Sequence, residues 1–164
     1  MKILDGQSLL AESGLDTFKR GSTFGALSDE AIRFLLTRGR ILSLADGEAL
    51  FHIGDAADSF FVVLQGQLDG FRESHSKEVP VLTITFGEQV GYVAMIGLFQ
   101  RLGDGRAHGP TVMLEITSDV FYQMHKELPF DFGILMLNLS REMARAFNKV
   151  TTHLIDASVG HPLA

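Results

Sequence analysis

The sequence of 164 residues contains no cysteine and no tryptophan. The lack of cysteine excludes a disulfide, a thiolate-bound metal and a catalytic thiol. No run of about 18 apolar residues occurs, so the sequence predicts no membrane-spanning helix. The N-terminal residues 1–6 include an acid and a glycine, which interrupt the apolar stretch that a secretory signal peptide needs. These absences predict a soluble protein of the cytoplasm.

Positive charge is scarce as well. The 14 lysines and arginines are outnumbered by 20 aspartates and glutamates, which gives a formal net charge of −6. A nucleic-acid-binding surface needs clustered cations that displace counterions from phosphates. The last helical pattern also ends too close to Ala164 for a helix-turn-helix to follow it. We therefore expect no direct contact with nucleic acid.

Apolar residues make up 46% of the chain, which is enough for the core of one domain. Helical patterns occupy both ends of the chain, over residues 9–18, 28–39, 119–128 and 132–155. Between them, residues 41–86 and 111–117 hold short apolar stretches separated by turn residues. This pattern is typical of a compact antiparallel sandwich or barrel. The intervening segment 103–110 is too rich in glycine for a regular strand.

The last helix carries apolar residues every three or four positions, and its later part resembles the seam of a coiled coil. The first half of this helix packs either on its own domain or on a partner, and the pattern does not choose between them. The second half would extend past a small domain, so its apolar stripe predicts a homodimer. The stripe consists of Leu135, Leu139, Met143, Phe147, Val150 and Leu154.

Residues 47–66 have the sequence GEALFHIGDAADSFFVVLQG. A glycine, an aromatic residue, a Gly-Asp pair, a further aspartate and an aromatic strand that ends in glycine follow one another here. Together with Gly87-Glu88, Gly91 and residues 113–116, this segment resembles the cyclic nucleotide-binding domain family, the sensor domains of cyclic-AMP-receptor-type regulators. The resemblance implies a mainly β fold, a double-stranded β-helix (jelly-roll) barrel with flanking N- and C-terminal helices.

In this family, the phosphate of the ligand lies at the start of a short helix that follows a turn glycine. Backbone N–H groups at such a point attract an anion, and glycine lets the backbone approach it closely. The resemblance places the turn at Gly91 and the helix-start amides at Tyr92, Val93 and Ala94. It places the arginine that pairs with the phosphate at Arg101.

The chain departs from the family pattern at two positions. Tyr92 stands where the family has a glutamate that binds the ribose 2′-hydroxyl, and Leu102 stands where it has a small hydroxyl residue. Thr151 lies where family members contact the purine, and Arg106 would replace Arg101 if the loop shifted register. The loss of one charge-assisted hydrogen bond costs about 1.5–3 kcal/mol, so a cyclic nucleotide is expected to bind weakly or not at all.

Each predicted site residue also has a purely structural interpretation. Gly91 would then serve only as a turn residue, and Thr151 would lie on the helix surface. Arg101 would be a solvated charge or a partner of Asp104. The ring of Tyr92 would fill the pocket itself and convert a ligand site into core.

No other chemistry finds support in the sequence. No two of the six histidines are close enough to form the His pair of a metal-binding cupin. Neither a Gly-x-Ser-x-Gly motif nor a P-loop occurs. We therefore predict no metal, no cofactor and no enzymatic activity, and the only small molecule expected is an anionic ligand such as a cyclic nucleotide.

These patterns divide the chain into a helical extension (1–23), a cyclic nucleotide-binding-like barrel (24–130) and a long helix with a tail (131–164). The favoured hypothesis is a non-enzymatic sensor domain with a degenerate phosphate-binding motif and no DNA-binding domain. The alternative is a protein-interaction module whose pocket is filled by its own side chains and binds no nucleotide.

Overall fold

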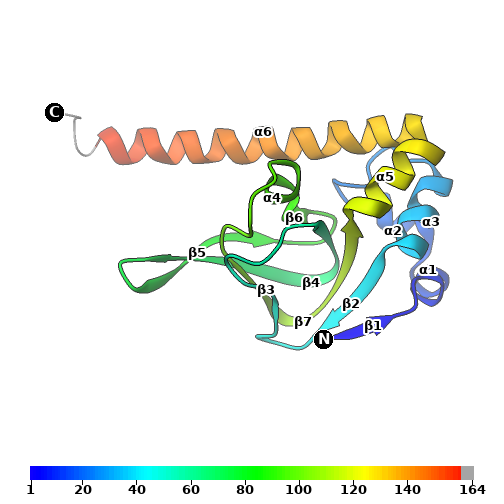
Figure 1. Cartoon of the computed structure of the whole chain (residues 1–164), viewed down its shortest axis with the longest axis horizontal. Helices are drawn as coiled ribbons and strands as arrows, with labels where there is room; N and C mark the ends of the chain where they lie inside the picture. The colour runs from blue at the N-terminus through cyan, green and yellow to red at the C-terminus, as the bar shows by residue number, and fades with distance from the viewer. Residues whose placement is uncertain (160–164) are drawn as a thin grey trace.

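The computed structural model describes residues 1–159. Over this range seven strands form one antiparallel sheet, several helices gather at one end of it, and the longest helix runs along the outside (Figure 1). The strands are β1 (Lys2–Leu4), β2 (Arg40–Leu44), β3 (Ala49–Phe51), β4 (Ser59–Ser74), β5 (Lys77–Ile84), β6 (Gln89–Val90) and β7 (Asp104–Thr117). The helices are α1 (Gly6–Ser13), α2 (Leu15–Phe18), α3 (Asp29–Arg38), α4 (Tyr92–Ile96), α5 (Ser118–Glu127) and α6 (Pro129–Val159).

The strands pair in the order β1-β2-β7-β4-β5, and β3 and β6 are added beside β7 and β4. Strands β4 and β7 form the centre, paired from Ser59–Thr117 to Phe71–Asp104. The predicted mainly β, jelly-roll fold is confirmed. The described strands do not close on themselves, because β1 and β5 each pair with a single neighbour, so the term barrel overstates the closure.

Side chains cap the helices of the N-terminal third. The Ser28 hydroxyl accepts a hydrogen bond from the N–H of Ala31 at 3.1 Å, and α3 lies within the helical pattern predicted over residues 28–39. Asp5 caps α1 in the same way through the N–H of Ser8 at 2.8 Å. The segment before α3 holds two short helices and strand β1, whereas the sequence predicts one short helix there.

Strand β7 begins at Asp104 and passes through the glycine-rich segment 103–110, so the prediction that no regular strand forms there is wrong. β7 lies between β2 and β4 and also pairs with β3, which satisfies its backbone groups on both sides. Gly105 lies against the ring of Phe51, where an added Cβ would lie 2.9 Å from Phe51 Cζ. Strand pairing therefore outweighs the low strand propensity of glycine.

Two apolar clusters lie on opposite faces of β4. Phe60 and Val62 point into the larger cluster, which the sheet shares with α3, α5 and α6. Phe61 and Val63 alternate with them along the strand and point into the smaller cluster. The smaller cluster includes Phe51 and Val90 at its edge, which brings it next to the segment before α4.

The first half of α6 is anchored to the domain. Leu135 and Leu139 are fully buried. Asn138 is also buried, and its Nδ2 donates hydrogen bonds to the carbonyl oxygens of Thr23 and Gly25 at 3.1 and 2.7 Å. This half of the apolar stripe therefore packs on its own domain.

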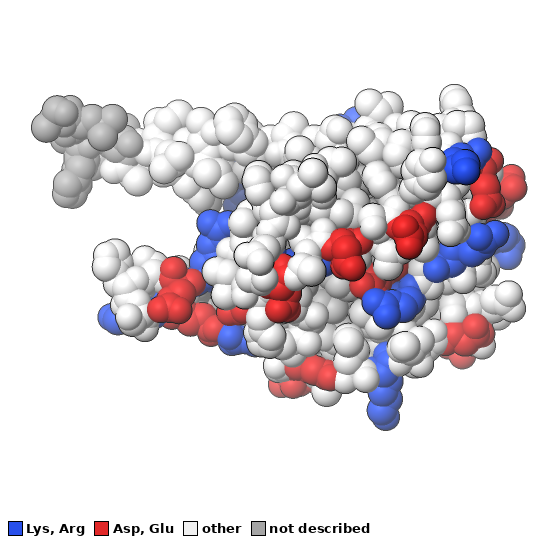
Figure 2. All heavy atoms as spheres, in the orientation of Figure 1, with Lys and Arg blue, Asp and Glu red and all other residues white. Residues whose placement is uncertain are grey.

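The second half of α6 runs along the same side of the molecule as the β4–β5 hairpin, with a gap between them (Figure 1). Phe147, Val150 and Ile155 are 75%, 57% and 58% exposed. Figure 2 shows few charged side chains on the visible face of this part of the helix and an open space between the helix and the β4–β5 hairpin. No helix within residues 1–159 combines the length and the apolar character that crossing a bilayer requires.

Replacement of Asn138 tests the anchoring of α6. Asn138→Ala leaves the carbonyl oxygens of Thr23 and Gly25 without their donor, so we expect the free energy of unfolding to fall by about 1–3 kcal/mol. Asn148→Ala, on an exposed face of the same helix, is the control and should be neutral or slightly stabilising because alanine favours helix. Urea denaturation followed by circular dichroism measures both, and equal stability of the two variants would contradict the anchoring.

Candidate functional site

A cavity of about 270 Å³ opens where β4, β5 and α4 meet the segment 101–104, and Ala146 of α6 also lines it. Its walls are mostly apolar, with aromatic and aliphatic side chains from β3, β4, β5, β6 and α4. Its polar lining consists of Arg72, Gln89, Arg101 and Asp104. A mostly apolar cavity with a few polar groups is typical of a small-molecule site.

Arg101 is the most deeply buried of these polar residues, with 4% of its surface exposed. Its Nη2 donates to the carbonyl oxygen of Ser59 at 2.8 Å and to Ser59 Oγ at 3.2 Å, and its Nη1 donates to the carbonyl oxygen of Gly91 at 3.4 Å. The rings of Phe51 and Phe61 lie 4.8 and 5.2 Å from its Cζ. These rings stabilise the cation through their negative faces.

The guanidinium of Arg101 has no counterion among the described residues. No carboxylate oxygen of residues 1–159 lies within 4.0 Å of it, and its Nε has no hydrogen-bond partner there. Burial lowers the pKa of Arg101, and the charges of Asp58, Glu115 and Asp55 oppose this shift. A guanidinium nevertheless keeps its proton in proteins, so a positive charge remains buried beside the cavity. Such a charge attracts an anion.

Asp104 does not neutralise Arg101, although it lines the same cavity. Its Oδ1 accepts the N–H of Ile53 at 2.9 Å and lies 3.3 Å from His52 Nδ1. The Ile53 N–H holds the pKa of Asp104 below its ordinary value, with a smaller contribution from His52. Arg101 is therefore neither a solvated surface charge nor a partner of Asp104.

Arg106, which the sequence allows as a substitute for Arg101, is engaged outside the cavity. Its Nη1 donates to Glu78 Oε2 at 2.8 Å, and its Cζ lies 4.8 Å from the ring of Phe71. Arg72 of β4 lines the cavity instead, and nothing in the sequence singles it out. The structure therefore places Arg101 and Arg72, and not Arg106, around the cavity.

Position 91 requires a glycine for two reasons, its backbone conformation and the closeness of the Arg101 side chain. Its φ of 88° lies in the left-handed region, which favours glycine. A Cβ at this position would lie 2.3 Å from Arg101 Nη1, so any side chain would displace the guanidinium. Gly91 is thus more than a turn residue, because it makes room for Arg101.

Tyr92 turns away from the cavity and is 2% exposed. Its ring packs edge-on against Phe60 and Phe121, at centroid distances of 5.5 and 6.2 Å, and its hydroxyl donates to Met136 Sδ at 3.5 Å. Burial raises the pKa of the Tyr92 hydroxyl. The interpretation in which this ring fills the pocket does not match its position, and Tyr92 offers no acceptor to a ligand in the cavity.

The remaining predicted site residues divide into two groups. Val93, Ala94 and Leu102 line the cavity, as Gly91 and Arg101 do. Thr151 is not among the lining residues, and its Oγ1 donates to the carbonyl oxygen of Phe147 at 2.9 Å within α6. Whether these residues bind a ligand stays a prediction.

Sequence reasoning missed the side chains that surround the guanidinium. Phe51, Ser59 and Phe61 all belong to the segment 47–66 that carries the family resemblance, but their order does not show that they contact Arg101. The pairing of Phe51 with Gly105 carries the ring to this end of β7. Strand register, which the sequence does not fix, brings them together.

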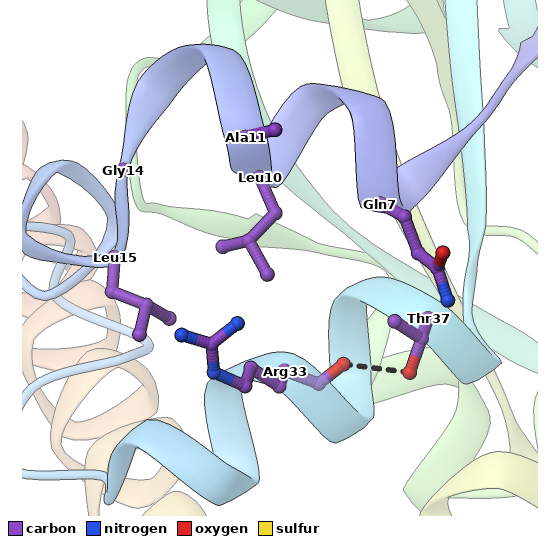
Figure 3. A pocket seen from close by; sticks show the side chains of 7 residues that line it. All are labelled: Gln7, Leu10, Ala11, Gly14, Leu15, Arg33 and Thr37. Atoms are coloured by element: carbon purple, nitrogen blue, oxygen red, sulfur yellow. Dashed lines mark hydrogen bonds between the residues drawn. The ribbon is translucent and has the colours of Figure 1, made fainter.

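A second cavity of about 500 Å³ lies between α1 and α3. Figure 3 shows the side chains of Leu10, Leu15 and Arg33 beside it. Its polar lining residues Gln7, Arg33 and Thr37 are all exposed, so it lacks the buried cation of the first cavity. Within the part of the chain that the structure describes, no group of three or more His, Asp or Glu side chains could hold a metal ion.

The chain is thus an antiparallel jelly roll with a buried arginine beneath a glycine turn. The family model of the cyclic nucleotide-binding domain matches residues 41–127. The chain belongs to the cyclic nucleotide-binding domain family.

Solved structures share the fold at low sequence identity. A cyclic nucleotide-binding domain from Methylobacillus flagellatus KT is 19% identical, with a TM-score of 0.82 over 99% of this chain and 92% of that chain. The catabolite activator protein of Thermus thermophilus is 20% identical, with a TM-score of 0.73 over 84% of this chain and 63% of that chain. These likenesses show the fold alone.

A curated relative matches part of the chain. The uncharacterized protein Rv0104 of Mycobacterium tuberculosis (strain ATCC 25618 / H37Rv) is 29% identical over 82 residues, which is 50% of this chain. The match covers 16% of that protein, so this chain corresponds to a small part of the relative's length.

Replacement of Arg101 by methionine tests whether the buried charge contributes to stability. Arg101→Met removes a desolvated cation that has no counterion, so we expect the free energy of unfolding to change by less than about 1 kcal/mol. Arg40→Met is the control, because Arg40 pairs with the buried carboxylate of Glu115 at 2.6 Å. Its loss leaves Glu115 without its cation and should cost about 1–3 kcal/mol.

Thermal and urea denaturation of both variants measures the contrast. A large destabilisation by Arg101→Met, equal to or above that of Arg40→Met, would show that Arg101 is a structural residue.

Proposed function

We propose that this domain is a regulatory sensor without enzymatic activity, which binds a small anion of the cyclic nucleotide class in the 270 Å³ cavity. The buried guanidinium of Arg101, which has an unpartnered Nε, carries this proposal. An uncompensated buried charge is costly, and an anionic ligand is its natural complement. Membership of the cyclic nucleotide-binding domain family supports the class of ligand.

The recognition of the nucleotide is proposed to be degenerate. Tyr92 stands where the family has a carboxylate for the ribose hydroxyl, and its own hydroxyl contacts Met136. The missing charge-assisted hydrogen bond corresponds to about 1.5–3 kcal/mol, or roughly ten- to a hundredfold in affinity. The affinity therefore depends on contacts of the ligand with Arg101 and with the apolar walls more than on contacts with its ribose.

Ligand binding is proposed to move the turn that precedes α4. The N–H groups of Val93 and Ala94 have no acceptor among the described residues, and both residues line the cavity beside Arg101. An anion held by the guanidinium would draw these groups inward. Tyr92, the next residue after Gly91, packs on Met136 of α6, so the movement would reach the long helix. Such a shift requires that the ligand prefer one position of α6.

We also propose that two copies of the chain pair through the second half of α6. The exposed apolar residues Phe147 and Val150 continue the stripe whose first half is buried. The face of this part of the helix that Figure 2 shows is mostly uncharged. Pairing would bury side chains that are costly to leave in water. A net charge of −6 argues against binding of nucleic acid by the domain itself.

Isothermal titration with cyclic AMP and cyclic GMP tests the ligand site. We expect heat of binding from the wild-type protein at up to millimolar nucleotide and at least about tenfold weaker binding by Arg101→Met, because the charge-assisted contact is lost. Arg106→Met is the matched control, since Arg106 is held by Glu78 outside the cavity, and should bind as the wild type does. No heat from the wild type at millimolar concentration removes the nucleotide proposal.

Light scattering with an α6 variant tests the dimer. We expect the wild-type protein to have twice the mass of one chain and Phe147→Glu to reduce it to one, because a buried carboxylate in an apolar seam is strongly unfavourable. Leu137→Glu is the control, since Leu137 is 55% exposed on α6 but does not belong to the stripe. A monomeric wild-type protein at high concentration would contradict the proposal.

A further inference from the structure

Glu142 of α6 ties the helix to two other parts of the domain. Its Oε2 accepts the N–H of Gln89 at 3.4 Å. Its Oε1 accepts the hydroxyl of Thr23 at 3.3 Å and that of Ser22. No cation lies within 4.0 Å of this half-buried carboxylate in residues 1–159. The helix is thus held by N–H and O–H donors from β6 and from the turn 21–23.

Gln89 connects this carboxylate with the ligand cavity. Gln89 lines the cavity, and its Oε1 accepts the N–H of Tyr92 at 3.4 Å at the start of α4. Tyr92 also contacts α6 directly, because its hydroxyl lies 3.5 Å from Met136 Sδ. The turn at Gly91 is therefore linked to α6 at two points, and one of them is Glu142.

The hydrogen bonds of Glu142 reach two different parts of the domain. The Gln89 N–H lies near the upper limit of hydrogen-bond distance, and on the other side the carboxylate contacts the Ser22 hydroxyl. The Ser22 hydroxyl has one hydrogen but two acceptors, since it also lies 3.1 Å from the carbonyl oxygen of Gly87. When Glu142 moves away, this hydrogen bonds to Gly87 instead. A displaced α6 would therefore not leave the Ser22 hydroxyl without an acceptor.

We infer that Glu142 is a positioning residue that couples occupancy of the cavity to the position of α6. The inference rests on the proposed ligand site and adds the residue through which that site regulates the helix. Movement of Gln89 with the Gly91 turn breaks its contact with Glu142, and the exchange of the Ser22 hydrogen bond makes the second position of α6 accessible. The two positions of α6 thus differ in discrete contacts, with the Ser22 hydroxyl bonded to Glu142 in one and to Gly87 in the other, and together they form a switch.

The single-tyrosine background Tyr122→Phe makes the coupling measurable. The chain has two tyrosines and no tryptophan, and Tyr122 is 60% exposed, so its replacement leaves Tyr92 as the only reporter between α4 and α6. In this background, Glu142→Ala removes the carboxylate, and Glu142→Gln keeps one oxygen for the Gln89 N–H. Asp156→Ala is the control, an exposed acid on the same helix.

The first measurement is made without ligand. We expect Glu142→Ala to increase acrylamide quenching of Tyr92 and to raise amide hydrogen exchange in residues 87–96 and 134–150 by about fivefold, the effect of one lost hydrogen bond. Glu142→Gln should restore part of the protection, and Asp156→Ala should change nothing. Equal behaviour of Glu142→Ala and Asp156→Ala overturns the inference.

The second measurement adds cyclic AMP. In the Tyr122→Phe protein, the nucleotide should change hydrogen exchange of residues 134–150 by about fivefold or more. Glu142→Ala should still give heat of binding but lose this response, whereas a merely structural residue would weaken binding and response together. A response of full size in Glu142→Ala overturns the inference. If no nucleotide binds the wild type, the proposed ligand fails, and the ligand-free measurement still decides the role of Glu142.

Discussion

The burial of one guanidinium without a counterion determines how the rest of the site is built. The backbone of Arg101 is fixed by the loop between β3 and β4, because its N–H donates to the carbonyl oxygen of Asp55 and its own carbonyl oxygen accepts the N–H of Gly54, both at 2.9 Å. Two phenyl rings flank the side chain, and the glycine at position 91 leaves space for it. The cation is thus held by backbone carbonyls and aromatic faces, which position a charge without neutralising it.

The same few residues join this charge to the long helix. The side chain of Tyr92 is part of the core between the sheet and α6. It therefore links the turn at Gly91 to the long helix. Gln89 has a double role, since it lines the cavity and contacts both α4 and Glu142. The lining of the cavity and the contacts with α6 therefore involve neighbouring residues.

The comparisons separate what is shared from what is particular to this chain. Solved structures at 19–20% identity share the fold, with TM-scores of 0.82 and 0.73 over 99% and 84% of this chain. A fold tolerates such divergence because apolar pattern and approximate volume suffice to specify it. A ligand site needs individual groups at defined distances, so similarity of fold does not identify a ligand. In this domain, the groups to examine are Arg101 and its surroundings.

The sequence by itself determined the elements whose signals are local. The apolar spacing predicted helices in the regions of α3, α5 and α6, and the family resemblance of the segment 47–66 implied the jelly roll. Tertiary structure decided the features that depend on partners distant in sequence. It made a strand of the glycine-rich segment before residue 110, turned Tyr92 into the core, and paired Asp104 with the loop at Ile53. These outcomes follow from strand register and burial, and register arises only when the strands meet, because a shift of one residue would turn every side chain to the opposite face.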